Sequence, residues 1–265
     1  MYQSTNEVKN VSNVIVCYKW VLDEAEIKVN GDLSVDFSKA KAKLNDYDRN
    51  GIEAGVQAAK VLGGKAYGMT LCGAGGKASI KPALARGLDE GIWANVEEAA
   101  DADSAVTAKA LAKAVAKTED IGLVICSEGA SDTYARQIPS KIGAYLDWPV
   151  ITAVQSMEIN GNELIAVRRL DDCMQTVKVT LPAVVSVMPE IANAPIPNLK
   201  AIMAAGKKPV TQYSAADLDM DFTPKAAKIG VRGYVMNRKN IILKDGEAAD
   251  KVAQLAAALR KEGVV

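Results

Sequence analysis

The chain has 265 residues, in which 32 Lys and Arg balance 32 Asp and Glu, and it contains no His. A balanced charge provides no positive field for nucleic acid or for an acidic membrane. The lack of His excludes catalysis by a Ser-His-Asp triad or a Cys-His pair, and it excludes His-based metal sites.

The four cysteines lie far apart, at Cys17, Cys72, Cys126 and Cys173. This spacing indicates neither a zinc site nor a disulfide framework. No apolar run is long enough to cross a bilayer, and the first ten residues lack a signal-peptide pattern. We therefore expect a cytoplasmic protein.

The first half of the chain alternates short apolar runs with helical patterns. Apolar runs at residues 14–17, 66–71, 92–94 and 121–125 predict buried strands, and Asn30-Gly31 predicts the turn of a small hairpin. Helices are predicted at residues 48–62, 78–86, 104–117 and 134–146. Their expected N-caps are Asp48 for the first, Asp101 or Asp103 for the third, and Asp132 or Thr133 for the fourth. Strands separated by helices predict a doubly wound, mostly parallel α/β sheet.

The second half begins with an antiparallel pattern, with strands predicted at residues 151–159, 164–170 and 174–181 and a last apolar strand at 182–187. A proline-rich connection leads to a helix at 199–205. Residues 210–244 are polar and weakly patterned, and a final amphipathic helix is predicted at 246–262. We predict an α/β domain over residues 1–200 and a C-terminal arm over 201–265. The pattern alone leaves open whether this arm packs on a partner or on its own domain.

Three predicted strands end at a cysteine that a turn follows, at Cys17, Cys72 and Cys126. Ligands of open α/β sheets bind beyond the carboxyl ends of the strands, so these positions favour a ligand crevice, although a single Cys is common in any buried strand. The strand 121–125, the loop after it and the next helix N-terminus form a place for an anion. The glycine-rich loop at Gly73 lacks the spacing of a P-loop. A carrier or binding subunit fits these features better than a hydrolase.

Several segments together closely resemble the electron transfer flavoprotein beta subunit, especially its bacterial branch associated with nitrogen-fixation and carnitine-type operons. The segments lie at residues 14–19, 44–48, 126–137, 145–149, 181–186 and 196–203. The resemblance implies a Rossmann-like, adenine-nucleotide-binding fold. It also implies a heterodimer with an alpha subunit that carries the redox-active FAD, while this chain holds AMP or a second FAD. A second FAD would indicate an electron-bifurcating component that also meets NADH.

The resemblance also assigns roles to residues of this chain. The nucleotide site would comprise Cys17, Asn45, Asp46, Tyr47, Asp48, Cys72, Gly73, Cys126, Asp132, Thr133, Tyr134, Arg136, Gln137 and Ile138. In the family the loop at 132–139 reads roughly D-G-D-T-x-Q-V-G, whereas Tyr134 and Pro139 depart from it here. Tyr134 could stack on a base or fill the core, and Arg136 could hold a phosphate bidentately.

A docking loop for partner flavoproteins would comprise Pro189, Glu190, Ile191, Ala192 and Asn193, with Ile191 as its apolar anchor. The implied function is a carrier of electrons between an acyl-CoA-dehydrogenase-type flavoprotein and another redox partner, with no catalytic residue of its own. The alternative is a stand-alone adenine-nucleotide-binding α/β protein that acts as a sensor or hydrolase.

Overall fold

The computed structural model describes residues 12–235 and 238–265. They fall into two compact units. The larger unit contains the described residues as far as Lys28 together with Asp36–Val231, and the smaller unit contains Val29–Val35 and the described residues between Arg232 and Val265.

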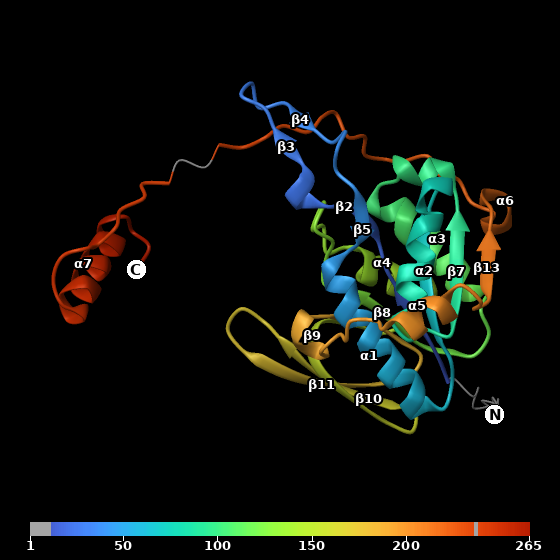
Figure 1. Ribbon diagram of the computed structural model, residues 1–265. Helices are drawn as coiled ribbons and strands as arrows, with labels where there is room; N and C mark the ends of the chain where they lie inside the picture. The colour runs from blue at the N-terminus through green and yellow to red at the C-terminus, as the bar shows by residue number, and fades with distance from the viewer. Residues whose placement is uncertain (1–11, 236–237) are drawn as a thin grey trace. The chain divides into compact units, whose positions relative to one another are not determined.

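A nine-stranded sheet forms the centre of the larger unit, in the order β11-β10-β9-β12-β8-β1-β6-β7-β13 (Figure 1). Along this order neighbouring strands from β9 to β13 are parallel, whereas β10 is antiparallel to both of its neighbours, β9 and β11. The strands are β1 (Asn13–Cys17), β6 (Ala66–Cys72), β7 (Glu90–Asn95), β8 (Ile121–Ser127), β9 (Val150–Asn160), β10 (Glu163–Arg169), β11 (Met174–Thr180), β12 (Ala183–Val187) and β13 (Val210–Tyr213). The predicted doubly wound, mostly parallel α/β fold with an antiparallel hairpin region is confirmed.

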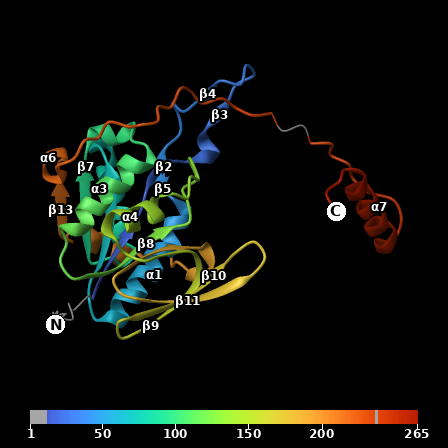
Figure 2. The ribbon, with the colours of Figure 1, turned by 180° about the vertical axis from the view of Figure 1, so that it is seen from behind.

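Helices cover both faces of this sheet (Figures 1 and 2). One face packs against α1 (Asp46–Leu62), α2 (Ile80–Leu84) and α5 (Leu199–Ala205), and the other against α3 (Ser104–Ala116), α4 (Ile138–Leu146) and α6 (Ala215–Leu218). Successive residues of β1 alternate between the two cores, with Val14 and Val16 on the α1 side and Ile15 on the α3 side. A strand buried on both faces must be apolar throughout, which explains its uninterrupted apolar sequence.

The strand order reverses between β1 and β8. From β1 the chain adds β6 and β7 on one side of the sheet, and it then crosses back to place β8 on the other side of β1. Such a reversal leaves a crevice beyond the carboxyl ends of the two strands, because the connections leave them in opposite directions. Cys17 and Ser127, the last residues of β1 and β8, therefore lie at the centre of the candidate crevice.

Two predicted helix starts were wrong. Helix α1 begins at Asp46 with Asn45 at the N-cap position, so Asp48 lies inside the first turn rather than at the cap. Helix α4 begins at Ile138 with Gln137 as N-cap, several residues later than predicted. A start at residue 134 would have placed Pro139 where its ring meets a helical carbonyl, whereas the observed start places it in the first turn, where its missing N–H costs nothing.

The sequence also concealed three strands. β2 (Trp20–Leu22) pairs with β5 (Ala42–Leu44), and the sequence predicted a strand at neither place. β13 lies in the segment read as weakly patterned and extends the sheet beside β7. It is an edge strand with exposed polar side chains, so its sequence lacks the apolar run of a central strand.

Other local predictions are confirmed. β3 (Lys28–Val29) and β4 (Val35–Asp36) form the two-stranded ribbon expected around Asn30-Gly31. Asp103 is the N-cap of α3, where its carboxylate accepts from the amides of Ala105 and Val106 at 2.8 and 2.9 Å. Short 3-10 helices occur at η1 (Glu24–Glu26), η2 (Ala74–Ser79), η3 (Glu97–Ala100) and η4 (Pro189–Ile191). Across the part of the chain that is described, each helix is too short or too polar to cross a membrane.

The smaller unit contains one helix, α7 (Ala248–Lys261), close to the predicted bounds. Here the amide of Gly233 donates to the carbonyl of Leu33 at 2.8 Å. The helix buries none of its residues, and Val252 and Leu255 on its apolar face are exposed. The division of the chain at residue 200 stays a prediction.

The close approach of α1 to β1 gives a first testable prediction. A Cβ on Gly55 would overlap the side chain of Val16, whereas a Cβ on Gly75, in η2, would meet open space. Gly55→Ala is expected to lower the free energy of unfolding by about 1–2 kcal/mol because the helix must move off the strand. Urea denaturation measures this loss, and Gly75→Ala is the matched control. Equal stability of the two variants would contradict the described packing.

Candidate functional site

Two of the three strand-end cysteines lie side by side. β1 and β8 pair in register up to Val16 and Ile125, so Cys17 and Cys126 follow as neighbours, and both are buried on the α3 side of the sheet. A hydrogen bond that the protonated Cys126 thiol makes to Cys17, together with burial, raises the pKa of Cys126 well above its ordinary value. Both groups act as small apolar side chains in the floor of the crevice.

Cys72 and Gly73 lie apart from this pair. Cys72 packs on the opposite face of the sheet, and its carbonyl accepts from the Trp93 indole at 3.1 Å. Gly73 lies against the carboxylate of Glu97, which also accepts from the amide of Ala74 at 2.7 Å. The structure therefore places these two predicted residues at the neighbouring end of β6, in contact with η2 and η3.

Asn45 joins the start of α1 to the loop that follows β8. Its side chain is fully buried; Nδ2 donates to the carbonyl of Gly129 at 3.1 Å, and Oδ1 accepts from the amide of Ser131 at 3.2 Å. Both hydrogen bonds connect segments more than 80 residues apart in sequence. The side chain thus closes one wall of the crevice.

This contact gives a second prediction. Asn45→Ala removes both hydrogen bonds and leaves two partly buried backbone groups unpaired, which we expect to lower the free energy of unfolding by about 1–3 kcal/mol. Hydrogen exchange of the amides at Gly129 and Ser131 should accelerate more than exchange in β8. Asn30→Ala, on an exposed turn, is the control. Unchanged exchange in the loop would show that Asn45 does not hold it.

Asp48 is a buried carboxyl group beneath the crevice. Its Oδ2 accepts from the amide of Lys19 at 2.7 Å. Burial raises the pKa of Asp48 from its ordinary 3.8 to about 6, although the Ser127 hydroxyl and the Lys19 amide act in the opposite direction. Asp46, by contrast, is tied to Lys43 at 3.1 Å and to Arg49 at 2.5 Å and belongs to a charged cluster at the start of α1.

The loop of residues 128–137 contacts the opposite wall of the crevice through charged and aromatic side chains. Asp132 pairs with Lys19 at 2.6 Å, and the ring of Tyr134 lies 5.7 Å from that of Tyr47 at a tilt of 45°. The Arg136 guanidinium lies over the Tyr134 ring, 4.6 Å from its centre. Nη2 of Arg136 also donates a hydrogen bond to the Tyr134 hydroxyl at 2.8 Å.

The backbone of this loop is strained at two residues. Tyr134 and Arg136 have φ values of 46° and 56°, in the left-handed region that ordinary side chains avoid. Tyr134 packs directly on Gly129, because a Cβ there would lie 2.7 Å from the ring atom Cε2. Strain of this kind often occurs where a loop is shaped for a ligand.

The remaining predicted loop residues have other surroundings. Thr133 is exposed, and its amide and hydroxyl both donate to Asp132. Gln137 accepts from the hydroxyl of Ser104 at 2.7 Å and from Lys141 at 2.8 Å, so it connects α4 to α3. Ile138 packs against the core between those helices. The structure thus brings Asn45, Tyr47, Asp48, Asp132, Tyr134 and Arg136 together and places Gln137 and Ile138 behind them.

The predicted docking loop is held to the larger unit. Glu190 pairs with Arg169 at 3.3 Å, and the carbonyl of Ala192 accepts from the Asn50 amide at 2.7 Å. Ile191 packs against the core. Ile196, a few residues later, is 93% exposed, and the carbonyl of Pro195 before it accepts from Arg86 at 3.3 Å. Ile196, unlike Ile191, is therefore an apolar side chain that this segment leaves exposed.

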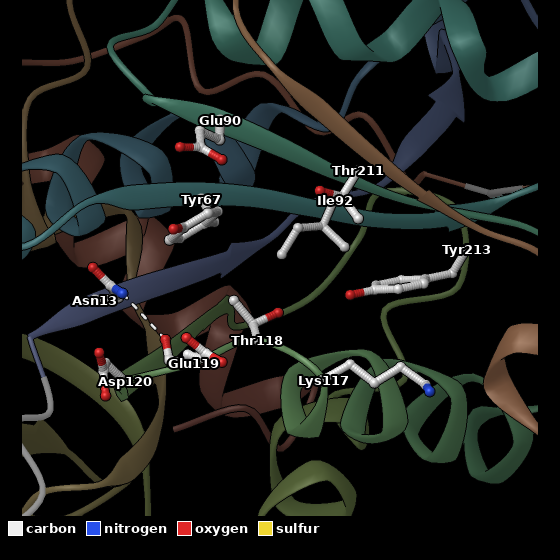
Figure 3. Close-up of a pocket in the computed structure, with 10 residues that line it drawn as sticks. All are labelled: Asn13, Tyr67, Glu90, Ile92, Lys117, Thr118, Glu119, Asp120, Thr211 and Tyr213. Atoms are coloured by element: carbon white, nitrogen blue, oxygen red, sulfur yellow. Dashed lines mark hydrogen bonds between the residues drawn. The ribbon is translucent and has the colours of Figure 1, made fainter.

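A shallow cavity of about 280 Å³ lies at the opposite, amino-terminal edge of the sheet (Figure 3). It is lined by Asn13, Tyr67, Glu90, Ile92, Lys117, Thr118, Glu119, Asp120, Thr211 and Tyr213. Sequence reasoning did not find it, because its residues come from five separate segments with no common motif. Among the described residues no cluster of potential metal ligands occurs, here or elsewhere.

A family model for the electron transfer flavoprotein domain matches residues 32–218. This chain belongs to the electron transfer flavoprotein family. The match begins between β3 and β4 and ends at the last residue of α6, and Cys17 and Lys19 lie before it. FAD is consistent with a flavoprotein family.

The crevice contains one buried hydroxyl without a partner and one exposed cation. The Ser131 hydroxyl is buried without a hydrogen-bond partner among the described residues, and it lies in the loop that Asn45 holds. Pro139 removes one N–H from the first turn of α4, where a phosphate would otherwise find donors. The exposed cation Arg136 is the best remaining group for a phosphate.

Proposed function

We propose that this chain is the beta subunit of a heterodimeric electron transfer flavoprotein of the bacterial branch. It would hold an adenine nucleotide in its crevice and carry electrons between an acyl-CoA-dehydrogenase-type flavoprotein and another redox partner. The observation that carries the proposal is the loop of residues 128–137, which the Asn45 side chain holds by hydrogen bonds. This loop lies within the residues that the family model matches, beside the reversal of the strand order. Nucleotide sites of open α/β folds occupy this position.

The residues of this chain would bind and orient the nucleotide. Tyr134 would offer a face to the adenine, and Arg136 would leave its contacts within the loop to pair with phosphate. Asn45 would keep the loop in place from beneath. The nucleotide would be AMP in a simple carrier or a second FAD in a bifurcating complex that also meets NADH. The redox-active FAD, mainly on the alpha subunit, supplies the electron-transfer chemistry.

Two exposed apolar features support the proposed partners. Ile196 lies between Pro195 and Pro197, which limit the entropy lost when this segment binds a partner flavoprotein. Helix α7 leaves Val252 and Leu255 exposed in its own unit, as expected of an arm that packs on the alpha subunit. The stand-alone sensor or hydrolase is not favoured, because the family is one of electron carriers.

The test is to co-express the chain with the product of the neighbouring gene, denature the purified complex and count the released nucleotides. One FAD and one AMP per heterodimer would support the simple carrier. Two FAD without AMP would support the bifurcating form. A complex that fails to form and a chain that carries no adenine nucleotide would together overturn the proposal.

A further inference from the structure

Glu128 is a buried carboxylate at the centre of the crevice. It follows the last residue of β8 directly, and its amide donates to the carbonyl of Val187 at 3.0 Å, so its backbone is fixed to the sheet. Its side chain is only 10% exposed. β8 borders β1 at the reversal of the strand order, so the carboxylate stands where a ligand of this fold would lie.

The hydrogen bonding of this carboxylate is incomplete. Among the described residues it makes one polar contact, with Arg136 Nη2 at 3.4 Å, and the Arg136 side chain is 60% exposed. An ionised carboxylate can accept about four hydrogen bonds, and a buried charge is costly unless it receives several. The geometry therefore leaves acceptor capacity that a ligand with hydroxyl groups would fill.

We propose that Glu128 recognises the ribose of the bound nucleotide, its two carboxylate oxygens accepting from the 2′- and 3′-hydroxyl groups. This inference rests on the proposed function, because it requires an adenine nucleotide in the crevice. Vicinal hydroxyls match the two oxygens of a carboxylate in spacing and polarity. An added 2′-phosphate would meet a buried negative charge, so the site would also reject nucleotides phosphorylated there.

Ribose binding would change the role of Arg136. In the described structure the guanidinium contacts Glu128 and the Tyr134 hydroxyl. Once ribose hydroxyls satisfy Glu128, the exposed arginine is free to turn toward the phosphate, which Pro139 deprives of a donor on α4. The sugar and the phosphate would thus be bound by two groups that are paired with each other in the absence of ligand.

The test uses the purified full-length chain, stripped of nucleotide, and isothermal titration calorimetry with AMP, 2′-deoxy-AMP and 3′-deoxy-AMP. We expect AMP to bind about 10- to 100-fold more tightly than either deoxy compound, since a hydrogen bond to a charged group contributes that much. Glu128→Gln should weaken AMP more than it weakens either deoxy compound, because AMP donates two hydroxyl groups to the carboxylate and each deoxy compound donates only one. Glu98→Gln, on the exposed surface of η3, is the matched control.

The outcomes separate this inference from the proposed function. If the wild-type chain binds AMP and both deoxy compounds equally well, the ribose assignment is overturned while the nucleotide site stands. If Glu128→Gln weakens all three to the same extent, Glu128 supports the fold and does not read the sugar. If the wild-type chain binds none of them, the nucleotide part of the proposed function fails as well. Thermal melting shows whether the variant remains folded.

Discussion

Replacing Asp48 by Asn is expected to remove a pH dependence from the stability of the protein. Burial raises the pKa of this carboxyl group from 3.8 to about 6 in the folded chain. Between these values the folded state keeps a proton that the unfolded state has released. Stability therefore falls as the pH rises through this window, and the loss is complete above the folded pKa.

A shift of about 2 pKa units corresponds to a loss of up to about 3 kcal/mol between pH 4 and pH 7.5. Asn cannot ionise, and its side-chain carbonyl can still accept from the Lys19 amide. The stability of Asp48→Asn relative to wild type should thus increase by up to this amount across the window. Urea denaturation of the nucleotide-stripped chain at half-unit pH intervals measures it. Asp172→Asn, at an exposed turn, controls for the loss of a charge. If the free energy of unfolding of wild type and of Asp48→Asn changes with pH in parallel, the burial of the Asp48 carboxyl is contradicted.

The protonation state of the buried Asp48 carboxyl also affects the residues that line the crevice. Asp48 lies one turn of α1 from the wall that Asn45 and Tyr47 form, and the amide it fixes belongs to Lys19, whose side chain pairs with Asp132 of the loop. Protonation of Asp48 weakens its hold on that amide, because a neutral carboxyl is a poorer acceptor than a carboxylate. Protonation of Asp48 is thus one route by which nucleotide affinity would depend on pH near 6, beside the second ionisation of the nucleotide phosphate, which falls in the same range.

The regular part of the fold could be predicted because it depends on local patterns. Strands buried on both faces must be largely apolar, as in β1 and β8, and α3 has a capping carboxylate and a run of strong helix formers. The edge strand β13 has no such requirement, since one side of it faces solvent. Its polar sequence resembles a loop, and only its pairing with β7 defines it as a strand.

The site could be predicted only in part because its contacts are long-range. The carboxyl ends of the strands identified the crevice, but no local pattern shows that Asn45 holds Gly129 or that Tyr134 packs on Tyr47. The strained loop delays the start of α4, which depends on tertiary contacts as much as on Pro139. Glu128 carries one local signal, since an acidic residue two positions after the apolar run of β8 is costly when buried unless it has a function there.

The docking segment shows the same limit. Ile191 and Ile196 are both isoleucines in the same proline-rich segment, so the sequence alone does not show which of the two side chains is exposed. In the structure Ile191 packs against the core, whereas Ile196 is exposed beyond an anchored Pro195. A large apolar side chain that is solvent-exposed on a segment held in place at its base is typical of a binding hot spot.

Ile196→Asp is therefore expected to impair electron transfer without affecting the fold. A charge in an apolar contact should reduce kcat/KM for reduction by an acyl-CoA-dehydrogenase-type partner about 30- to 100-fold, the range of a hot-spot residue. The effect should fall mainly on KM, since the distance between the flavins within a formed complex does not change. Steady-state reduction of the heterodimer at increasing partner concentration measures it, with flavin content and melting temperature as checks on integrity.

The controls separate a specific contact from a general effect of charge. Val61→Asp makes a comparable change on a side chain that is 65% exposed at the carboxyl end of α1, and it should leave kcat/KM unchanged. Ile196→Leu keeps apolar area and should retain most of the activity. If Ile196→Asp and Val61→Asp behave alike, or if kcat falls while KM is unaltered, Ile196 is not where the partner docks. A selective loss at Ile196 would show that the exposed side chain, rather than the loop residues packed on the core, carries the recognition.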